Sequence, residues 1–491
     1  MSFDLSSKHA VAKHFSRSNV QLKSLVMAMC VTWVCTAQAH GQTTQAPVQY
    51  QELGRSILAE LVAARPVHER GSTEAAQKIA ARLRAVGFPE QDIHFVAPPE
   101  HPHKGNLVVR LRGKSDYKAT LLIGHLDVVE AKAEDWSFDP FVLTEKDGWL
   151  YGRGVIDMLG QDSAMLTSLI RLKQEGYVPQ RDIIVAFTAD EEAGGVANGV
   201  DWLLKHRPEL VKASLVINPD AGEAAIKNGK KIYLTVQTSE KMFLSFEVEV
   251  TDKGGHSSRP TKDNPIYRLS KALARLSDYA FPLHLTETVK LYFQGRAALE
   301  SGQVQRDMLA VSGKKPDLAA AERLSRAVET NIQLRTTCTA TEIGGGHAEN
   351  ALPQRAKATI QCRVVPGETQ EQTEALLKKV MQDPSLKFSV RTAARPSPES
   401  PPSASIRQIV DSVTQSMWPG IAVLPNMTAG ASDSIYTRAA GIPTYGIDAM
   451  FDDLDDGRAH GRDERIHTKV FAEELEFIYR LIKKVDQTPQ N

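Results

Sequence analysis

The sequence has little cysteine and no excess of charge of either sign. Only 4 cysteines occur among 491 residues and none are spaced as C-x-x-C, which argues against a thiolate zinc site. Lysine plus arginine and aspartate plus glutamate each number 59, and no long run of one sign is present. The chain therefore lacks the basic footprint for nucleic acid or anionic lipid, and we expect a small molecule or short peptide as its partner.

The N-terminal region has an apolar stretch that is short for a membrane span. The stretch 25–37 falls below the roughly 20 residues that a spanning helix needs, and two threonines interrupt it. Arg17 and Lys23 precede it, and Ala37-Gln38-Ala39 ends it. This pattern is typical of a secretory signal peptide over residues 1–39, with a membrane anchor as the alternative. We expect cleavage after Ala39, no stable membrane span after processing, and an exported, periplasmic or secreted protein.

Removal of this leader leaves two cysteines, Cys338 and Cys362. In an oxidising compartment they could form a disulfide. They could equally be small buried hydrophobic residues on neighbouring strands. The sequence leaves both interpretations open.

The length of the chain and its periodic patterns indicate two domains, one of them split in sequence. Amphipathic helical stripes alternate with short apolar runs rich in branched side chains, which are typical of buried parallel strands: 119–123, 183–187 and 215–217. A helical pattern between the first two of these runs ends at Gly176. The sequence therefore predicts an α/β fold with a mostly parallel sheet, whose first part covers residues 47–238.

The pattern changes near Glu240. Residues 243–250 and 356–364 alternate like strands with one buried face, and helical segments lie between them at 265–276 and 318–328. We interpret residues 240–392 as an inserted α+β lid or dimerisation domain. Four prolines between 396 and 402 mark the exit, and a helical pattern resumes at 406–417. Residues 404–491 are then the second part of the catalytic domain.

Polar motifs follow each of the three predicted parallel strands. They are Gly124-His125-Leu126-Asp127, Thr188-Ala189-Asp190-Glu191-Glu192 and Asn218-Pro219-Asp220. Ligands in open α/β sheets gather beyond the carboxyl ends of the strands, so these motifs stand where a site is expected.

Two further motifs contain Asp157, which precedes a helix, and His460, near the C-terminus. Taken singly, each motif has an ordinary interpretation, such as a polar contact, a helix cap or an acidic loop. Taken together, two histidines and three carboxylates form a ligand set for two zinc ions that share one carboxylate.

The motifs resemble those of the di-zinc metallopeptidase family that includes aminoacylase-1, Gly-Xaa carboxypeptidase, glutamate carboxypeptidase and succinyl-diaminopimelate desuccinylase. The resemblance covers nearly all of the chain after the leader, in the order His-x-Asp, Gly-Arg-Gly ending in Asp157, Asp-Glu-Glu, Gly-Gly-His-Ser and His-Gly-x-x-Glu. One departure is Leu159, which stands where the family often has lysine.

The resemblance implies specific roles for the residues of the ligand set. His125 and Asp220 would bind one metal, Glu192 and His460 the other, and Asp157 would bridge them. Asp127 would orient His125, and Glu191 would be the general base that moves a proton from water to the leaving amine. The family also implies a cis peptide bond between Asp157 and Met158.

In the inserted domain, the resemblance assigns His256 to polarisation of the scissile carbonyl. Asn350, Arg363 and Gly430 would contact the substrate, with Arg363 as the clamp for a terminal carboxylate, because its guanidinium pairs bidentately with such a group. The family also makes a homodimer through the inserted domain possible.

The function that these assignments imply is that of a zinc-dependent carboxypeptidase or dipeptidase acting on short peptides next to a free carboxylate. An N-acyl-amino-acid amidohydrolase with the same two-metal site is the alternative. A third hypothesis, a catalytically inactive metal-dependent binding protein, is weakened by Glu191, since a binding protein needs no unligated carboxylate beside its metals.

Overall fold

The computed structural model describes residues 43–115, 117–192 and 195–488. The signal peptide predicted at 1–39 lies outside these ranges. Within them, no helix has the length and apolar character needed to cross a membrane.

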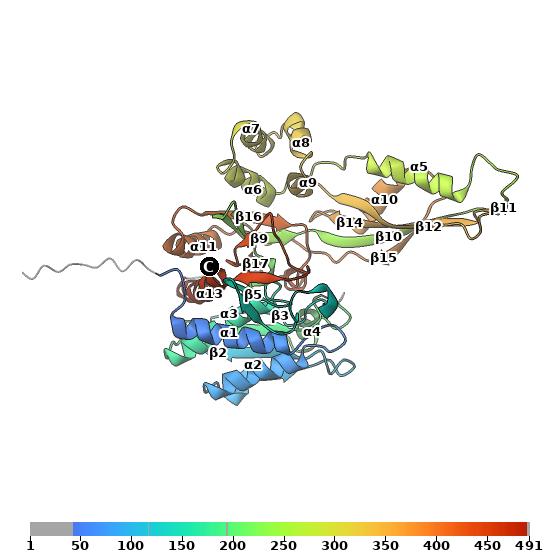
Figure 1. Ribbon diagram of the computed structural model, residues 1–491. Coiled ribbons are helices and arrows are strands. Elements are labelled where there is room, and N and C mark those ends of the chain that lie inside the picture. Colours follow the sequence, from blue (N-terminus) through green and yellow to red (C-terminus); the bar gives the residue numbers. More distant parts are fainter. Residues whose placement is uncertain (1–42, 116, 193–194, 489–491) are drawn as a thin grey trace, which may run out of the picture. The chain divides into compact units, whose positions relative to one another are not determined.

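The central feature is a ten-stranded sheet, which confirms the α/β fold class (Figure 1). Its inner strands run parallel, whereas antiparallel strands join on both sides. In order across the sheet the strands are β1 (Ile93–Val96), β2 (Asn106–Leu111), β6 (Ile183–Thr188), β3 (Ala119–His125), β7 (Ala213–Asn218), β17 (Thr444–Ile447), β9 (Lys230–Glu240), β8 (Ala224–Lys227) and β18 (Asp452–Asp453), with β16 (Ala422–Thr428) also paired to β9.

Both faces of this sheet are buried, which explains the continuous apolar runs in the sequence. Alternate side chains of β6 enter different apolar clusters: Ile183, Val185 and Phe187 enter one, and Ile184 and Ala186 the other. The first cluster is covered by α1 (Val48–Ala63), α2 (Thr73–Ala85), α3 (Leu159–Gln174), α11 (Ala404–Met417) and α13 (Thr468–Gln487). The second is covered by α4 (Gly199–His206), with α12 (Ser434–Ala439) beside it.

Residues 242–392 contribute a separate four-stranded antiparallel sheet, which we call the insert sheet. Its order is β12 (Thr337–Gly345), β14 (Arg355–Val364), β10 (Met242–Thr251) and β15 (Lys387–Thr392). One face packs on α5 (Pro265–Ser277) and α10 (Gln370–Met381), and the other carries polar side chains, as the alternating pattern predicts. The domain borders given above, 47–238, 240–392 and 404–491, stay predictions. The strands of a sheet do not define the residue at which a domain begins or ends.

Between α5 and β12 the chain forms four short helices: α6 (Glu287–Ala297), α7 (Gly302–Val311), α8 (Leu318–Leu324) and α9 (Val328–Leu334). The helix predicted at 318–328 begins at Leu318 as predicted but ends at Leu324, and a second helix begins at Val328. The break allows Leu324 and Leu334 to reach the same apolar cluster. Helix α6 was not predicted; it packs closely on β16, where a Cβ atom at Gly295 would lie 2.4 Å from the Leu424 side chain.

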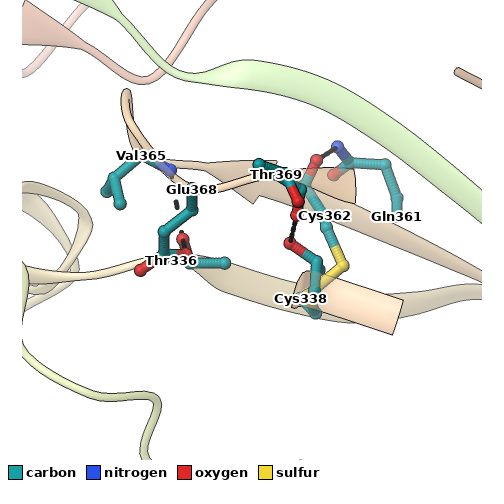
Figure 2. Close-up of a disulfide and its surroundings, with 8 residues drawn as sticks. Thr336, Cys338, Gln361, Cys362, Val365, Glu368 and Thr369 are labelled. Atoms are coloured by element: carbon teal, nitrogen blue, oxygen red, sulfur yellow. Dashed lines mark hydrogen bonds between the residues drawn. A yellow bond between two sulfur atoms is a disulfide. The ribbon is translucent and has the colours of Figure 1, made fainter. Parts of the chain in front are cut away.

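Cys338 and Cys362 form a disulfide between β12 and β14 (Figure 2). They lie directly opposite each other in the strand register. Cys362 also lies in the apolar core under the insert sheet. The disulfide interpretation is therefore confirmed, and the interpretation as a small buried residue also holds for Cys362.

Candidate metal centre

The polar motifs meet where three neighbouring strands end. Strand β3 ends at His125, while the motifs containing Glu191 and Asp220 directly follow β6 and β7. The three strands are parallel neighbours in the order β6-β3-β7. Their carboxyl ends therefore share one edge of the sheet, as the sequence predicts.

Asp157 lies between the two candidate histidine ligands. Its Oδ1 atom is 3.2 Å from His125 Nε2, and its Oδ2 atom is 3.0 Å from His460 Nε2. The same two nitrogens each have a second carboxylate nearby: Asp220 Oδ1 is 3.7 Å from His125 Nε2, and Glu192 Oε1 is 2.8 Å from His460 Nε2. One carboxylate thus faces both halves of the cluster, which is the arrangement that a bridging ligand requires.

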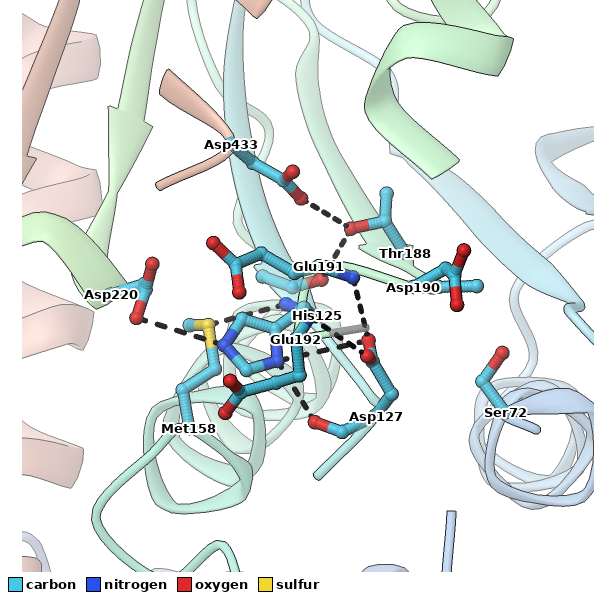
Figure 3. A network of polar contacts seen from close by, with 12 residues as sticks. Ser72, His125, Asp127, Met158, Thr188, Asp190, Glu191, Glu192, Asp220 and Asp433 are labelled. Atoms are coloured by element: carbon cyan, nitrogen blue, oxygen red, sulfur yellow. Dashed lines mark hydrogen bonds and ion pairs between the residues drawn. The ribbon is translucent and has the colours of Figure 1, made fainter. Parts of the chain in front are cut away.

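Three groups of side chains within this cluster are close enough to hold an ion. In each group the ligand atoms lie within 4.8 Å of one another. The groups are His125, Asp157 and Asp220; His125, Glu191 and Glu192; and Asp157, Glu192 and His460 (Figure 3 shows most of these side chains).

The cluster has an excess of negative charge that its histidines partly offset. Hydrogen bonds to Asp157 and Glu192 raise the pKa of His460 to about 10. Although burial opposes the charged form, hydrogen bonds to Asp157 and Asp220 raise the pKa of His125 well above its usual range. Divalent cations bound to the neutral histidines would offset the same negative charge. Imidazole and carboxylate donors in this number suit zinc, so the residues fit the metal that the sequence predicts.

Glu191 differs from its neighbour Glu192. Burial raises the pKa of the Glu191 carboxyl well above its usual range, and the nearby carboxylates act in the same direction. Among the described residues, nothing donates a hydrogen bond to its side chain, whereas Glu192 contacts His460. The Glu191 carboxylate is thus the one in the Asp-Glu-Glu motif that stays free to exchange protons.

Asp127 contacts the turn after β6 with its carboxylate. Its two oxygens accept the backbone N–H groups of Glu191 and Glu192, each at 3.1 Å (Figure 3). His125 Nδ1 lies 2.9 Å from the backbone carbonyl of Asp127, while the Asp127 carboxylate is 3.9 Å away. The orienting contact predicted for Asp127 is therefore made here by its backbone, and its side chain holds the turn that carries Glu191.

The loop before α3 is held by Glu464. Its carboxylate accepts the backbone N–H groups of Gly154, Ile156 and Asp157 at 3.0, 2.8 and 3.3 Å, and it pairs with Arg153 at 2.6 Å. The sequence contains this residue in its His-Gly-x-x-Glu motif but gives no role for it. Asp157 does not cap α3, whose N-cap residue is Met158, and the peptide bond between the two is cis, as the resemblance implies.

Asp433 is a further buried carboxylate that sequence reasoning missed. It accepts hydrogen bonds from Asn198 at 2.5 Å and from Thr188 at 3.3 Å, beside the turn that carries Glu191 (Figure 3). Burial raises its pKa to about 7. Its place three residues after Gly430, which the sequence predicts to contact the substrate, is the signal that could have identified it.

The candidate residues of the insert make local contacts. His256 is exposed on β11 (Gly255–His256), which pairs with β13 (Ala351–Leu352), and the carbonyl of Asn350 accepts the N–H of Ser257. Arg363 is half-buried with its guanidinium 4.9 Å from the ring centroid of Phe243. Gly430 is exposed on the loop after β16. Among the described residues, no hydrogen bond or ion pair joins these four to the metal-ligand candidates.

Comparison with known families places this site in context. Residues 121–484 match the description "Peptidase family M20/M25/M40". The chain belongs to this family. It is accordingly a metal-dependent hydrolase of the class of metallopeptidases and amidohydrolases.

Relatives within the family differ in their substrates. The chain is 29% identical over 380 residues to the human N-fatty-acyl-amino acid synthase/hydrolase PM20D1. The aligned region covers 74% of each chain. It is 30% identical over 400 residues to a probable carboxypeptidase S-like 2 of Dictyostelium discoideum, which covers 78% of this chain and 75% of that protein. Among solved structures, an M20 family metallo-carboxypeptidase from Sulfolobus solfataricus shares the fold with a TM-score of 0.65 at 18% identity, over 89% of this chain and 99% of the other.

Proposed function

We propose that this protein is a zinc-dependent metallopeptidase of the carboxypeptidase or dipeptidase type, which hydrolyses an amide bond next to a free carboxylate in short peptides. The observation that carries the proposal is the pair of histidines joined through Asp157, with Glu191 unengaged beside them. A binding protein would have no use for this free carboxylate, whereas a hydrolase needs a group that accepts a proton from water.

The donor set supports two zinc ions per chain. His125 and Asp220 would hold one ion, Glu192 and His460 the other, and Asp157 would contribute one oxygen to each. When bound, the two ions supply Lewis-acid polarisation of the scissile carbonyl and activation of water.

Glu191 carries out the proton transfers in this proposal. Its carboxylate takes a proton from water as the water oxygen bonds to the carbonyl carbon. The carbon–nitrogen bond then breaks, and the proton passes from Glu191 to the leaving nitrogen.

The insert residues would hold the substrate. Burial lowers the pKa of Arg363, which indicates that its charge lacks full solvation, and no carboxylate of the described residues forms an ion pair with it. A substrate carboxylate would supply the missing anion. His256 would donate to the oxygen of the carbonyl, and Asn350 and Gly430 would contact the substrate backbone.

A second candidate function is hydrolysis of N-acyl amino acids, which the similarity to PM20D1 favours. The two functions share the metal ligands, the base and the carboxylate clamp. They differ only in the group on the acyl side of the bond.

The deciding experiment varies the acyl group alone. The zinc-loaded enzyme would be assayed on glycyl-leucine, N-acetyl-leucine and N-lauroyl-leucine, each beside its leucine-amide counterpart. The peptidase proposal requires the highest kcat/KM on the dipeptide; a higher value on either acyl-leucine would favour the second candidate. Absence of hydrolysis of all three free acids would contradict both.

We also propose export. The leader pattern supports it, and so does the disulfide between Cys338 and Cys362, because such bonds persist in oxidising compartments. N-terminal sequencing of the protein from the exported fraction should begin at His40. Recovery of only the uncleaved chain from the cytoplasm would contradict this.

We further propose a homodimer through the insert. Strand β12 is an edge strand that is exposed over most of its length, and such edges readily pair with another chain. Ile343 on this strand and Tyr267 on α5 are exposed apolar residues. Light scattering on the purified protein should give twice the mass of one chain, and the mass of one chain at all concentrations would contradict the dimer.

A further inference from the structure

The described polar contacts of Glu191 hold its backbone and not its side chain. Its carboxylate has no hydrogen-bond or ion-pair partner among the described residues, although its own N–H is bound by Asp127 at 3.1 Å. Glu192, by contrast, is held at its carboxylate by His460. The contacts that fix the turn after β6 therefore also fix the backbone from which the Glu191 carboxylate projects.

The turn is anchored through the residue before Glu191. Asp190 is completely buried and has a left-handed backbone with a φ of 64°. Its Oδ1 atom lies 2.5 Å from Lys104 Nζ, and its Oδ2 atom accepts the N–H of Ala197 at 2.7 Å. Both oxygens are thus used to hold a backbone conformation that is uncommon outside glycine.

Lys104 is itself a buried cation, only 2% exposed, in the segment that leads into β2. Besides Asp190, its Nζ atom lies 2.9 Å from His68 Nδ1. Two residues later, Asn106 accepts the N–H of Ala189 at 2.9 Å. Consecutive residues before the base, Ala189 and Asp190, are therefore tied to one short segment, while Asp127 holds the turn from the other side.

We propose that Lys104 is a positioning residue for the general base: its buried ion pair with Asp190 fixes the turn that aims the Glu191 carboxylate. Asp190, the partner of the buried Lys104, is the residue immediately before Glu191. Lys104 therefore acts on the base through a single peptide unit. Removing the charge leaves Asp190 buried without its cation, and the turn relaxes to solvate or protonate it. The inference rests on the proposed role of Glu191.

A double-mutant cycle tests this coupling. Lys104→Met keeps the length of the side chain and removes its charge. We expect it to lower kcat about ten- to hundredfold, the scale of a misplaced catalytic group, with KM within about threefold of wild type and the metal content retained. In a Glu191→Gln background the same change should lower kcat less than about twofold, because the group that Lys104 positions is already gone.

A matched control separates this effect from a general loss of stability. Arg171 forms an ion pair with Glu476 at 2.8 Å that joins α3 to α13 and does not touch the turn. Arg171→Met should lower the thermal midpoint and leave kcat near wild type in both backgrounds.

A second variant guards against misfolding of Lys104→Met. Asp190→Asn keeps the side-chain shape and can still accept the Ala197 N–H, and we expect the same loss of kcat from it. Equal losses in the wild-type and Glu191→Gln backgrounds, or no loss, would overturn the positioning role. If Glu191→Gln alone turns over near the wild-type rate, it is instead the base assignment of the proposed function that fails.

Discussion

The central sheet and the insert sheet present their candidate functional residues in different ways. At the ends of β3, β6 and β7, His125, Glu192 and Asp220 belong to one set of mutual contacts that also includes Asp157. On the insert, His256 lies on β11, which pairs with β13, and Arg363 on β14 contacts Phe243 of the neighbouring strand β10. The candidate metal ligands thus meet at one edge of the central sheet, while the candidate substrate-binding residues His256 and Arg363 stand on the insert.

The physical reason lies in the two kinds of sheet. Parallel strands buried on both faces bring their carboxyl ends to one edge, so a polar residue placed there must meet its counterparts. The insert sheet is antiparallel and has one open polar face, where pairs such as Lys357 with Glu247 lie in solvent.

The largest expected effect concerns Glu191, beside the candidate metal ligands of the central sheet. Glu191→Gln should keep the fold and the metals, and lower kcat by about two to four powers of ten, because the amide cannot accept a proton from water. Metal analysis, circular dichroism and steady-state kinetics check these points together. Glu134→Gln, an exposed change on the loop after β3, is the control and should be silent. Near-wild-type turnover of Glu191→Gln would remove the base from the account.

The next prediction asks whether the insert takes part in catalysis at all. His256→Ala should retain metal and stability and lower kcat at least about tenfold, since the loss of one oxyanion donor commonly costs more than this. His347→Ala, another exposed histidine of the insert, serves as the control. An unimpaired His256→Ala enzyme would separate the insert from the chemistry.

Mixing His256→Ala with Glu191→Gln then shows which chain supplies the histidine. Recovered activity means that the histidine acts across a homodimer, because each hybrid holds one intact composite site. No recovery means that each chain completes its own site.

The third prediction concerns the carboxylate clamp. Amidation of the substrate carboxylate should lower kcat/KM of the wild type about ten- to hundredfold, the equivalent of one lost charge-assisted contact. Arg363→Gln should have a low kcat/KM on the free acid, and amidation of the substrate should change that value little. Arg355→Gln changes an exposed arginine of the same strand and should keep the preference for the free acid. Equal wild-type rates on both substrates would reassign Arg363 to structure.

The smallest expected effect concerns stability on the buried side of the central sheet. Asp448 follows β17, and burial raises its pKa to about 7 next to the carboxyl of Glu474. The folded protein therefore holds this proton more tightly than the unfolded chain does. As the pH rises from 3.8, the ordinary pKa, to about 7, the free energy of unfolding should therefore fall. The fall is at most about 1.4 kcal/mol per pH unit for this one proton.

Asp448→Asn should reduce that fall, so that the drop in thermal midpoint between pH 5 and pH 8 is smaller than in wild type by a few degrees. Asp411→Asn, on the exposed side of α11, should leave the drop unchanged. An identical pH profile for wild type and Asp448→Asn would show that this carboxyl titrates alike in the folded and unfolded chains.

The sequence predicts the three parallel strands at the centre of the large sheet, because each is a strong apolar run, and three of the candidate ligand motifs directly follow them. The motifs of Asp157 and His460 follow no such run, and the ligand roles of all five residues stay predictions. It predicts less about contacts that join distant segments. Glu464 lies 307 residues from Asp157, and the His-Gly-x-x-Glu motif that contains it does not indicate which backbone groups it binds. Lys104 lies 86 residues from Asp190 and stands in no recognisable motif. Helix α6 escaped prediction because its buried residues, Val289 and Phe293, pack against a strand far along the chain.

Metal content measured together with activity tests the central claim most directly. The account requires two divalent ions per wild-type chain, loss of activity with a chelator and its return with zinc. Asp157→Ala should bind both ions more weakly, since one carboxylate faces both halves of the cluster. An active preparation with no more than one ion per chain, or an Asp157→Ala protein that keeps two, would contradict it.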